Sequence, residues 1–184
     1  HVDGKRFSWN DTVTYRGMMF SSVPNLLWVW GYARFAWTLR VDLIAELARD
    51  GIQVVLTGSP AEADVCAELV ARSVNCTSLA GQTAVPVLAE VQRGAAVVLG
   101  PDCGPLHLAV ATGTPTVHLF GPSDPVRYGP WGDPRRHQVV RAGWHCPRCG
   151  DLSPGRPAGC GCMLAISPHN VIDAARSVLA HHAG

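Results

Sequence analysis

From about residue 33 to its end, the chain alternates short apolar runs with segments in which apolar residues recur every three or four positions. The short runs have the length and continuous apolar character of buried strands, and the longer segments have the spacing of amphipathic helices. We predict strands at IQVVLTG (52–58), CTSLAG (76–81), AAVVLG (95–100), TPTVHLFG (114–121) and HQVVRA (137–142). We predict helices at FAWTLRVDLIAELARDG (35–51), AEADVCAELVARS (61–73), VPVLAEVQRG (85–94), PLHLAVATG (105–113) and HNVIDAARSVLAHH (169–182).

Strands of continuous apolar character that alternate with helices are typical of a parallel sheet covered on both faces. The pattern therefore predicts an α/β fold, a Rossmann-like parallel sheet with helices on both faces. Two segments break the alternation: residues 1–30 show no clear period, and residues 143–166 are rich in Gly, Pro and Cys. We expect an atypical N-terminal segment at 1–30 and a Rossmann-like domain at 31–184, with 143–166 as a loop.

Composition narrows the class of protein a little further. With 184 residues, 47% of them hydrophobic and 16% charged, the chain can bury a proper core. A formal net charge of +1 gives no electrostatic reason to expect a nucleic-acid partner. No apolar run approaches the roughly 18 residues of a membrane-spanning helix. We expect a cytoplasmic protein, and because the chain starts at His1 without a leader, it can be a fragment.

Candidate chemistry gathers where a predicted strand meets a predicted helix, in GPDCGPLH (100–107). Ligands of open parallel sheets bind beyond the carboxyl ends of the strands, and the bare amides of a helix N-terminus attract phosphates. Gly104 lets a diphosphate approach the backbone, and Pro105 starts the helix without wasting an amide. Asp102 can bond a sugar hydroxyl or cap the helix, and His107 can lend a proton to a phosphate. From these residues alone, a purely structural turn is an equally good interpretation.

The longer string VVLGPDCGPLHLAVATGTPTVHLFGPSDPVRYGPWG (97–132) resembles the signature of glycosyltransferase family 9, the ADP-heptose:lipopolysaccharide heptosyltransferases. VVLTGSPAEADVCAELV, LAGQTAVPVLAEV and ISPHNVIDAARSVL match the family in the same order, so the resemblance covers about residues 33–182. It implies the GT-B fold, in which two Rossmann-like domains face each other across a cleft. This chain would then be the C-terminal, nucleotide-sugar-binding half of that fold.

The resemblance also implies roles for the residues of the strand-to-helix turn. Asp102, Gly104 and His107 match the family's Asp-x-Gly-x-x-His pattern, which binds the donor. Asp102 would contact the sugar. The amides of Cys103, Gly104 and Leu106 would face the diphosphate.

Two further positions match donor-binding residues of the family. Glu62 matches an acid that bonds the ribose, and Thr83 matches a residue that lies against the adenine. Each has a structural alternative. Glu62 is equally well explained as an acid favoured by a helix dipole, and for Thr83 we slightly prefer a helix cap.

The resemblance is weakest at its start. The family usually enters this domain through a strand, a Pro-Gly turn and a Lys-Arg-Trp motif whose lysine binds phosphate. Here LLWVWGYARF (26–35) has Trp28 and Val29 where basic residues are expected. The resemblance implies that the N-terminal domain, which carries the acceptor site and the catalytic carboxylate in this family, lies outside this sequence. Glycosyl transfer needs a base for the acceptor hydroxyl, so we expect the isolated chain to lack its catalytic base.

A cluster of cysteines lies in the 143–166 segment. Cys146, Cys149, Cys160 and Cys162 form two close pairs, a spacing that suits a tetrahedral structural zinc site, with His145 as an alternative ligand. The family commonly has cysteines in this loop without a metal in its mechanism, which slightly favours free thiols or a disulfide. We expect no cofactor for catalysis.

The function implied is the inverting, metal-independent transfer of heptose from ADP-heptose to the lipopolysaccharide core. The implied partners are an ADP-heptose-like donor and a lipopolysaccharide core acceptor, which the missing N-terminal domain would hold. The implied location is the cytoplasm, peripheral at the inner face of the inner membrane. The alternative is a non-catalytic Rossmann-like module that binds a nucleoside diphosphate and that zinc can stabilise.

Overall fold

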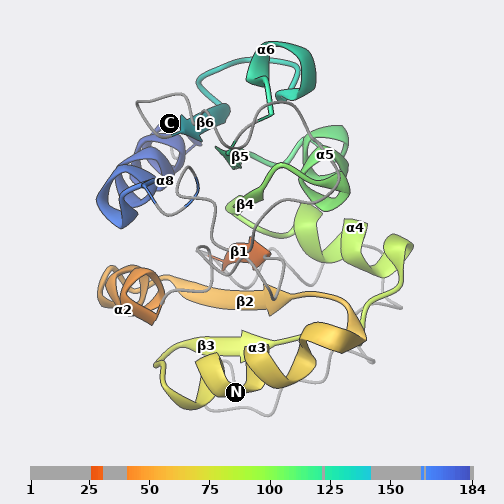
Figure 1. The fold of residues 1–184 in the computed structure, drawn as a ribbon, viewed down its shortest axis with the longest axis vertical. Helices are drawn as coiled ribbons and strands as arrows, with labels where there is room; N and C mark the ends of the chain where they lie inside the picture. Colours follow the sequence, from red (N-terminus) through yellow and green to blue (C-terminus); the bar gives the residue numbers. More distant parts are fainter. Residues whose placement is uncertain (1–25, 31–40, 122, 142–162, 164, 183–184) are drawn as a thin grey trace.

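A computed structural model of the chain describes residues 26–30, 41–121, 123–141, 163 and 165–182. Its centre is a six-stranded sheet in the order β3-β2-β1-β4-β5-β6, in which every pair of neighbours is parallel (Figure 1). The strands are β1 (Leu26–Trp30), β2 (Gln53–Thr57), β3 (Cys76–Ser78), β4 (Val97–Pro101), β5 (Thr116–Phe120) and β6 (His137–Arg141). The predicted class is confirmed: this is an α/β fold with a parallel sheet.

Helices cover both faces of the sheet, as the continuous apolar strands require. They are α2 (Val41–Arg49), α3 (Ala63–Ala71), α4 (Val85–Arg93), α5 (Gly104–Ala111), α6 (Pro125–Tyr128) and α8 (Pro168–His182), with a 3₁₀ turn at Pro60–Glu62 before α3. One core cluster joins α2, α3 and α8 to one face, and a second joins α4 and α5 to the other. Because successive strand residues point to opposite faces, Val55 and Val98 belong to the second cluster while Val54 and Leu99 belong to the first.

The strand order places a topological switch point between β1 and β4. From β1 the chain runs outward through α2 to β2, whereas from β4 it runs through α5 to β5 in the opposite direction. The two connecting helices lie on opposite faces of the sheet. The carboxyl ends of β1 and β4 therefore form the kind of switch point beyond which open α/β sheets bind ligands. The predicted tip at residues 102–107 follows β4 and therefore borders this switch point.

The structure corrects one predicted boundary. The domain was expected to begin at residue 31, but β1 (Leu26–Trp30) is an interior strand that pairs with both β2 and β4. The sheet therefore extends into the 1–30 segment. The short helix α6 was also not predicted. Among the described residues, no helix is long and apolar enough to cross a membrane.

Candidate functional site

The turn between β4 and α5 exposes the start of a helix without capping it. Cys103 is the N-cap residue, its backbone is extended, and its own side chain makes no capping hydrogen bond. The alternative in which Asp102 caps the helix is therefore wrong. Among the described residues, Gly104 opens onto free space, because a Cβ atom built there would meet none of their atoms within 4 Å. This openness is what the approach of a phosphate to the backbone requires.

The amides of this first turn are not equally available. The Leu106 amide donates to the Cys103 carbonyl at 3.1 Å, so its predicted role toward the diphosphate needs correction: the helix already uses it. Within the described residues, the amides of Cys103 and Gly104 have no hydrogen-bond partner. Two backbone donors with the positive end of a helix dipole behind them form an anion-binding position.

Asp102 and His107 face each other across the turn. His107 Nε2 lies 3.3 Å from Asp102 Oδ1, and both side chains are partly exposed. The Asp102 amide donates to the Leu119 carbonyl of β5 at 3.1 Å, which ties this residue to the sheet. The carboxylate orients the imidazole, so the ring can donate a hydrogen bond where the free amides of Cys103 and Gly104 receive an anion.

Gln92 supports the turn from α4, and sequence reasoning missed it. Its side chain is fully buried and donates from Nε2 to the Pro105 carbonyl at 3.0 Å. The backbone carbonyl of Gln92 accepts a hydrogen bond from Thr114 Oγ1 at 2.9 Å, so the residue joins α4 to the start of α5 and to the segment after its end. A glutamine among the apolar positions of VPVLAEVQRG was the available signal, because a buried polar side chain needs a partner.

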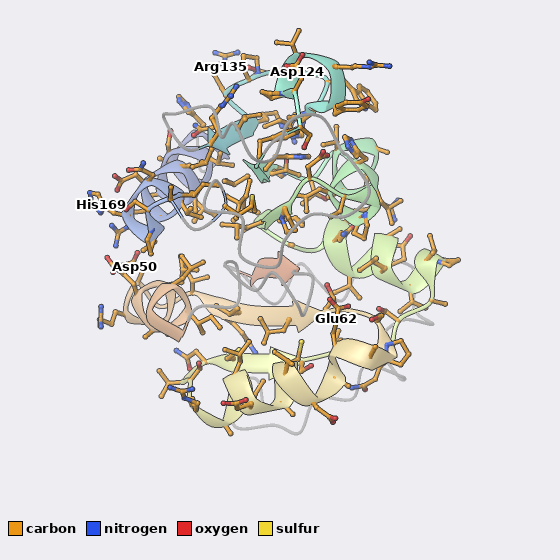
Figure 2. All side chains as sticks on the ribbon, viewed as in Figure 1. Asp50, Glu62, Asp124, Arg135 and His169 are labelled. Atoms are coloured by element: carbon orange, nitrogen blue, oxygen red, sulfur yellow. The ribbon has the colours of Figure 1, made fainter. Side chains whose placement is uncertain are left out.

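Glu62 lies at the carboxyl end of β2, between the 3₁₀ turn and α3 (Figure 2). It is 6% exposed, and its Oε2 accepts hydrogen bonds from the Ser59 amide at 2.7 Å and the Ser59 hydroxyl at 2.8 Å. This reciprocal arrangement is a capping box. Glu62 does lie in the first turn of a helical segment, as its structural alternative requires, and the capping box is an additional role that the sequence analysis did not name. The ribose contact stays a prediction.

The buried Cys103 thiol senses the negative charges of both Asp102 and Glu62. Burial raises its pKa to about 12; the Leu106 amide opposes this shift, while the negative charges of Asp102 and Glu62 add to it. Both carboxylates are therefore near enough to Cys103 for their fields to reach it, although they follow different strands. A thiol with so high a pKa is not a nucleophile at neutral pH.

Thr83 is half-buried in the segment before α4. The N-cap of α4 is Ala84, and no side chain caps the helix. The cap we slightly preferred for Thr83 is therefore wrong, and the adenine contact stays a prediction. Cys146, Cys149, Cys160 and Cys162 lie outside the described residues, within which no cluster of three metal-ligating side chains occurs.

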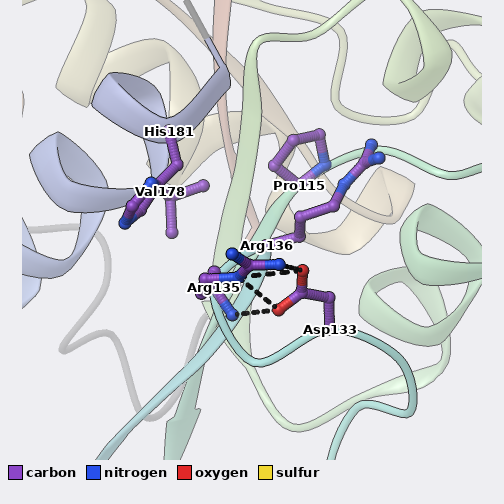
Figure 3. Close-up of a pocket in the computed structure, with 6 residues that line it drawn as sticks. All are labelled: Pro115, Asp133, Arg135, Arg136, Val178 and His181. Carbon is purple, nitrogen blue, oxygen red and sulfur yellow. Dashed lines mark hydrogen bonds and ion pairs between the residues drawn. The ribbon is translucent and has the colours of Figure 1, made fainter. Parts of the chain in front are cut away.

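A cavity of about 230 Å³ lies at the opposite, amino edge of the sheet (Figure 3). It is lined by Pro115, Asp133, Arg135, Arg136, Val178 and His181. Its guanidinium groups bind other residues of the chain. Arg135 donates to both carboxylate oxygens of Asp133 through Nε and Nη2, and Arg136 donates to the Gly113 carbonyl after α5. We do not assign this cavity to the candidate site, which lies at the carboxyl edge.

Comparison with known proteins extends the resemblance seen in the sequence. The model of glycosyltransferase family 9 (heptosyltransferase) matches residues 36–153. Lipopolysaccharide heptosyltransferase 3 of Escherichia coli K12 is 39% identical over 116 residues, which are 54% of this chain and 34% of that protein. This chain thus spans about a third of the length of that relative.

Solved structures show the same fold. The Escherichia coli ADP-heptose LPS heptosyltransferase II matches 97% of this chain and 54% of its own, with a TM-score of 0.71 and 22% identity. An Escherichia coli heptosyltransferase solved with ADP-2-deoxy-2-fluoro heptose matches 76% of this chain and 40% of its own, with a TM-score of 0.53 and 25% identity. From the matched family model, the chain belongs to glycosyltransferase family 9.

Proposed function

We propose that this chain is the donor-binding, C-terminal half of a GT-B heptosyltransferase, which transfers heptose from ADP-heptose to the lipopolysaccharide core. One observation carries the proposal: the uncapped start of α5 presents the free amides of Cys103 and Gly104 beside the Asp102–His107 pair. The relative solved with an ADP-heptose analogue supports this choice of donor.

The site suits an inverting transfer whose leaving group is ADP. Negative charge develops on the diphosphate as the glycosidic bond breaks, and the two free amides together with the dipole of α5 stabilise it. His107 supplies a proton or a positive charge to the same oxygens. Asp102 would hold the sugar, and we keep Glu62 and Thr83 as candidates for the ribose and adenine contacts.

Another part of the enzyme would supply the catalytic base. Of the two carboxylates near the tip, Asp102 faces His107 and Glu62 accepts two hydrogen bonds from Ser59. Both are thus engaged in the fold, and a base must be placed to remove a proton from the acceptor hydroxyl. The acceptor site and this base would lie on an N-terminal domain, with the enzyme in the cytoplasm at the inner face of the membrane.

Calorimetry and a transfer assay test the proposal together. ADP and ADP-heptose should bind the chain weakly, since it would supply only one side of a GT-B cleft, and the chain alone should transfer no heptose to a lipopolysaccharide acceptor. Failure of both nucleotides to bind would overturn the donor site. Transfer of heptose by the isolated chain would contradict the proposal that the base and the acceptor site lie on another domain. ADP binding equal to that of ADP-heptose would favour the non-catalytic module.

A structural zinc at the four clustered cysteines is a separate proposal. If they bind zinc, the purified protein should contain about one equivalent per chain, and chelation should lower its melting temperature. The Cys146→Ser and Cys160→Ser variants should both lose the metal, whereas Cys66→Ser, outside the cluster, should retain it. A metal-free wild type with unchanged melting would leave the thiols free or paired in a disulfide.

A further inference from the structure

A buried histidine lies behind the tip and takes no part in the chemistry described above. His118 of β5 is fully buried, with its ring stacked on Phe120 at a centroid distance of 6.3 Å. Its ring centroid lies 5.7 Å from that of His107, on the first turns of α5. Gly100 of β4 pairs with it in the sheet. Within the described residues, His118 Nδ1 has no hydrogen-bond partner.

The other ring nitrogen of His118 belongs to a chain of hydrogen bonds. His118 Nε2 lies 2.9 Å from Thr116 Oγ1, and the same hydroxyl lies 2.9 Å from His137 Nδ1 at the start of β6. Thr116 is fully buried, whereas His137 is only half-buried. A single hydroxyl proton can be donated in one direction only. Thr116 must therefore donate to one imidazole and accept from the other.

This constraint couples the proton positions of the two histidines. When His137 is protonated, its Nδ1–H must donate to Thr116, so Thr116 donates to His118 Nε2 and the proton of neutral His118 sits on Nδ1. When His137 is neutral with a bare Nδ1, Thr116 can donate to it, and His118 then carries its proton on Nε2. His118 itself stays neutral throughout, because burial lowers its pKa to about 3, with the neighbouring histidines adding to the effect.

We propose that His118 is a positioning residue for His107, and that Thr116 relays the protonation of His137 to it. The two tautomers of His118 have ring dipoles of opposite sense, so the switch changes the electric field at the His107 ring, whose centroid lies 5.7 Å away. The role of His107 toward the diphosphate rests on the proposed function, whereas the relay itself does not.

The charged and titratable groups around the relay are few among the described residues. Asp102 faces His107 at the tip. Around His137, burial lowers its pKa first, the positive charge of Arg136 lowers it further, and the negative charge of Asp133 opposes both. His137 therefore titrates below the usual histidine range, and the switch in His118 should follow that titration rather than one of its own.

Nitrogen-15 NMR of histidine-labelled protein, without any ligand, tests the relay. As pH falls through the titration of His137, the His118 signals should move toward the pure Nδ1–H tautomer, with the midpoint of His137. Thr116→Val should abolish this response, and Thr116→Ser, which keeps the hydroxyl, should restore it. A His118 tautomer that ignores the titration of His137 in the wild type overturns the relay, whether or not the variants fold.

The nitrogen-15 shifts of the His107 ring in the same spectra test the positioning role. His118→Gln, which has no tautomers, should change these shifts, and Thr116→Val should change them as well. Unchanged His107 ring shifts in both variants overturn the role of His118. ADP calorimetry on the wild type keeps the two claims apart: a switch in His118 without ADP binding would contradict the proposed function and leave the relay standing.

Discussion

Two strand-to-helix turns lie at the carboxyl edge of this sheet, and they use their polar groups differently. In the β2–α3 turn, Ser59 and Glu62 satisfy each other in a capping box. Gly58 has no room beside them, because a Cβ atom there would lie 3.0 Å from Glu62 Oε2. In the β4–α5 turn the N-cap side chain makes no capping bond, and a Cβ atom at Gly104 would meet open space among the described residues.

The difference teaches how to separate a structural turn from a binding turn. Natural helices rarely leave their first amides without partners unless water or a ligand takes them. The β2–α3 turn needs nothing from outside to satisfy Ser59 and Glu62, whereas the β4–α5 turn leaves the amides of Cys103 and Gly104 for another molecule. Gly58 is needed because the turn is tightly packed around it, whereas Gly104 leaves room for a ligand to reach the backbone.

The largest expected effect comes from Gly104→Val. Its branched side chain would occupy the open space before the amides, so ADP binding should weaken by about a hundredfold, about 2.7 kcal/mol. The fold should survive, because a Cβ atom there meets nothing within 4 Å. Calorimetry gives the affinity and thermal unfolding gives the stability.

Gly58→Ala is the matched control in the other turn. Its Cβ would press on the Glu62 carboxylate, so we expect a loss of about 1–3 kcal/mol in unfolding free energy, as overpacking usually costs. The comparison breaks down if Gly104→Val unfolds the protein, or if it binds ADP like the wild type while the fold is intact.

Acid should lower the stability of the protein through His118, which lies in β5 behind the β4–α5 turn. Its pKa is about 3 in the folded protein, against a usual value near 6.5, so the unfolded chain binds the extra proton between these two values. This contribution to stability is complete above pH 6.5 and should fall by about 1.4 kcal/mol for each pH unit toward 3. Denaturant unfolding across this range measures the slope.

His118→Gln serves as the control for the acid effect, since it keeps a polar side chain that does not titrate. Its stability should depend less steeply on pH than that of the wild type between pH 6.5 and 3. His137 contributes to the pH dependence of stability in both proteins, because its pKa is also lowered. Parallel pH profiles would mean that His118 is not buried in its neutral form.

Some of these features could be predicted from the sequence, and others required the structure. The continuous apolar strands and the helical periods defined the fold class, because both patterns are local. β1 (LLWVW) was missed since five apolar residues without a recognisable helix after them are ambiguous. At the candidate site, Asp102, Gly104 and His107 are close in sequence, so the sequence alone could group them. Gln92 was not, because its bond to Pro105 spans 13 residues and depends on how α4 packs on α5.

A smaller effect is expected from Asp102→Ala. The variant should weaken ADP-heptose about tenfold and ADP much less, since only the sugar offers hydroxyls to the carboxylate, and a charged hydrogen bond contributes about 1.5–3 kcal/mol. Asp102→Asn, which can still bond a hydroxyl, should recover part of the loss. Equal losses for both nucleotides would assign Asp102 to holding His107 at 3.3 Å rather than to the sugar.

The smallest effect, and the sharpest choice between cap and ligand contact, concerns Thr83. A capping threonine costs about 1 kcal/mol of stability when it is replaced by alanine. Because the N-cap of α4 is Ala84 and no side chain caps that helix, Thr83→Ala should leave the unfolding free energy within about 0.5 kcal/mol of wild type. If Thr83 lies against the adenine, the variant should bind ADP about threefold more weakly, whereas inorganic diphosphate, which has no base, should bind both proteins equally. A loss of stability with unchanged ADP binding would show that Thr83 stabilises the start of α4 and does not contact the adenine. Weaker binding of diphosphate would show that the substitution perturbs the phosphate site at the start of α5.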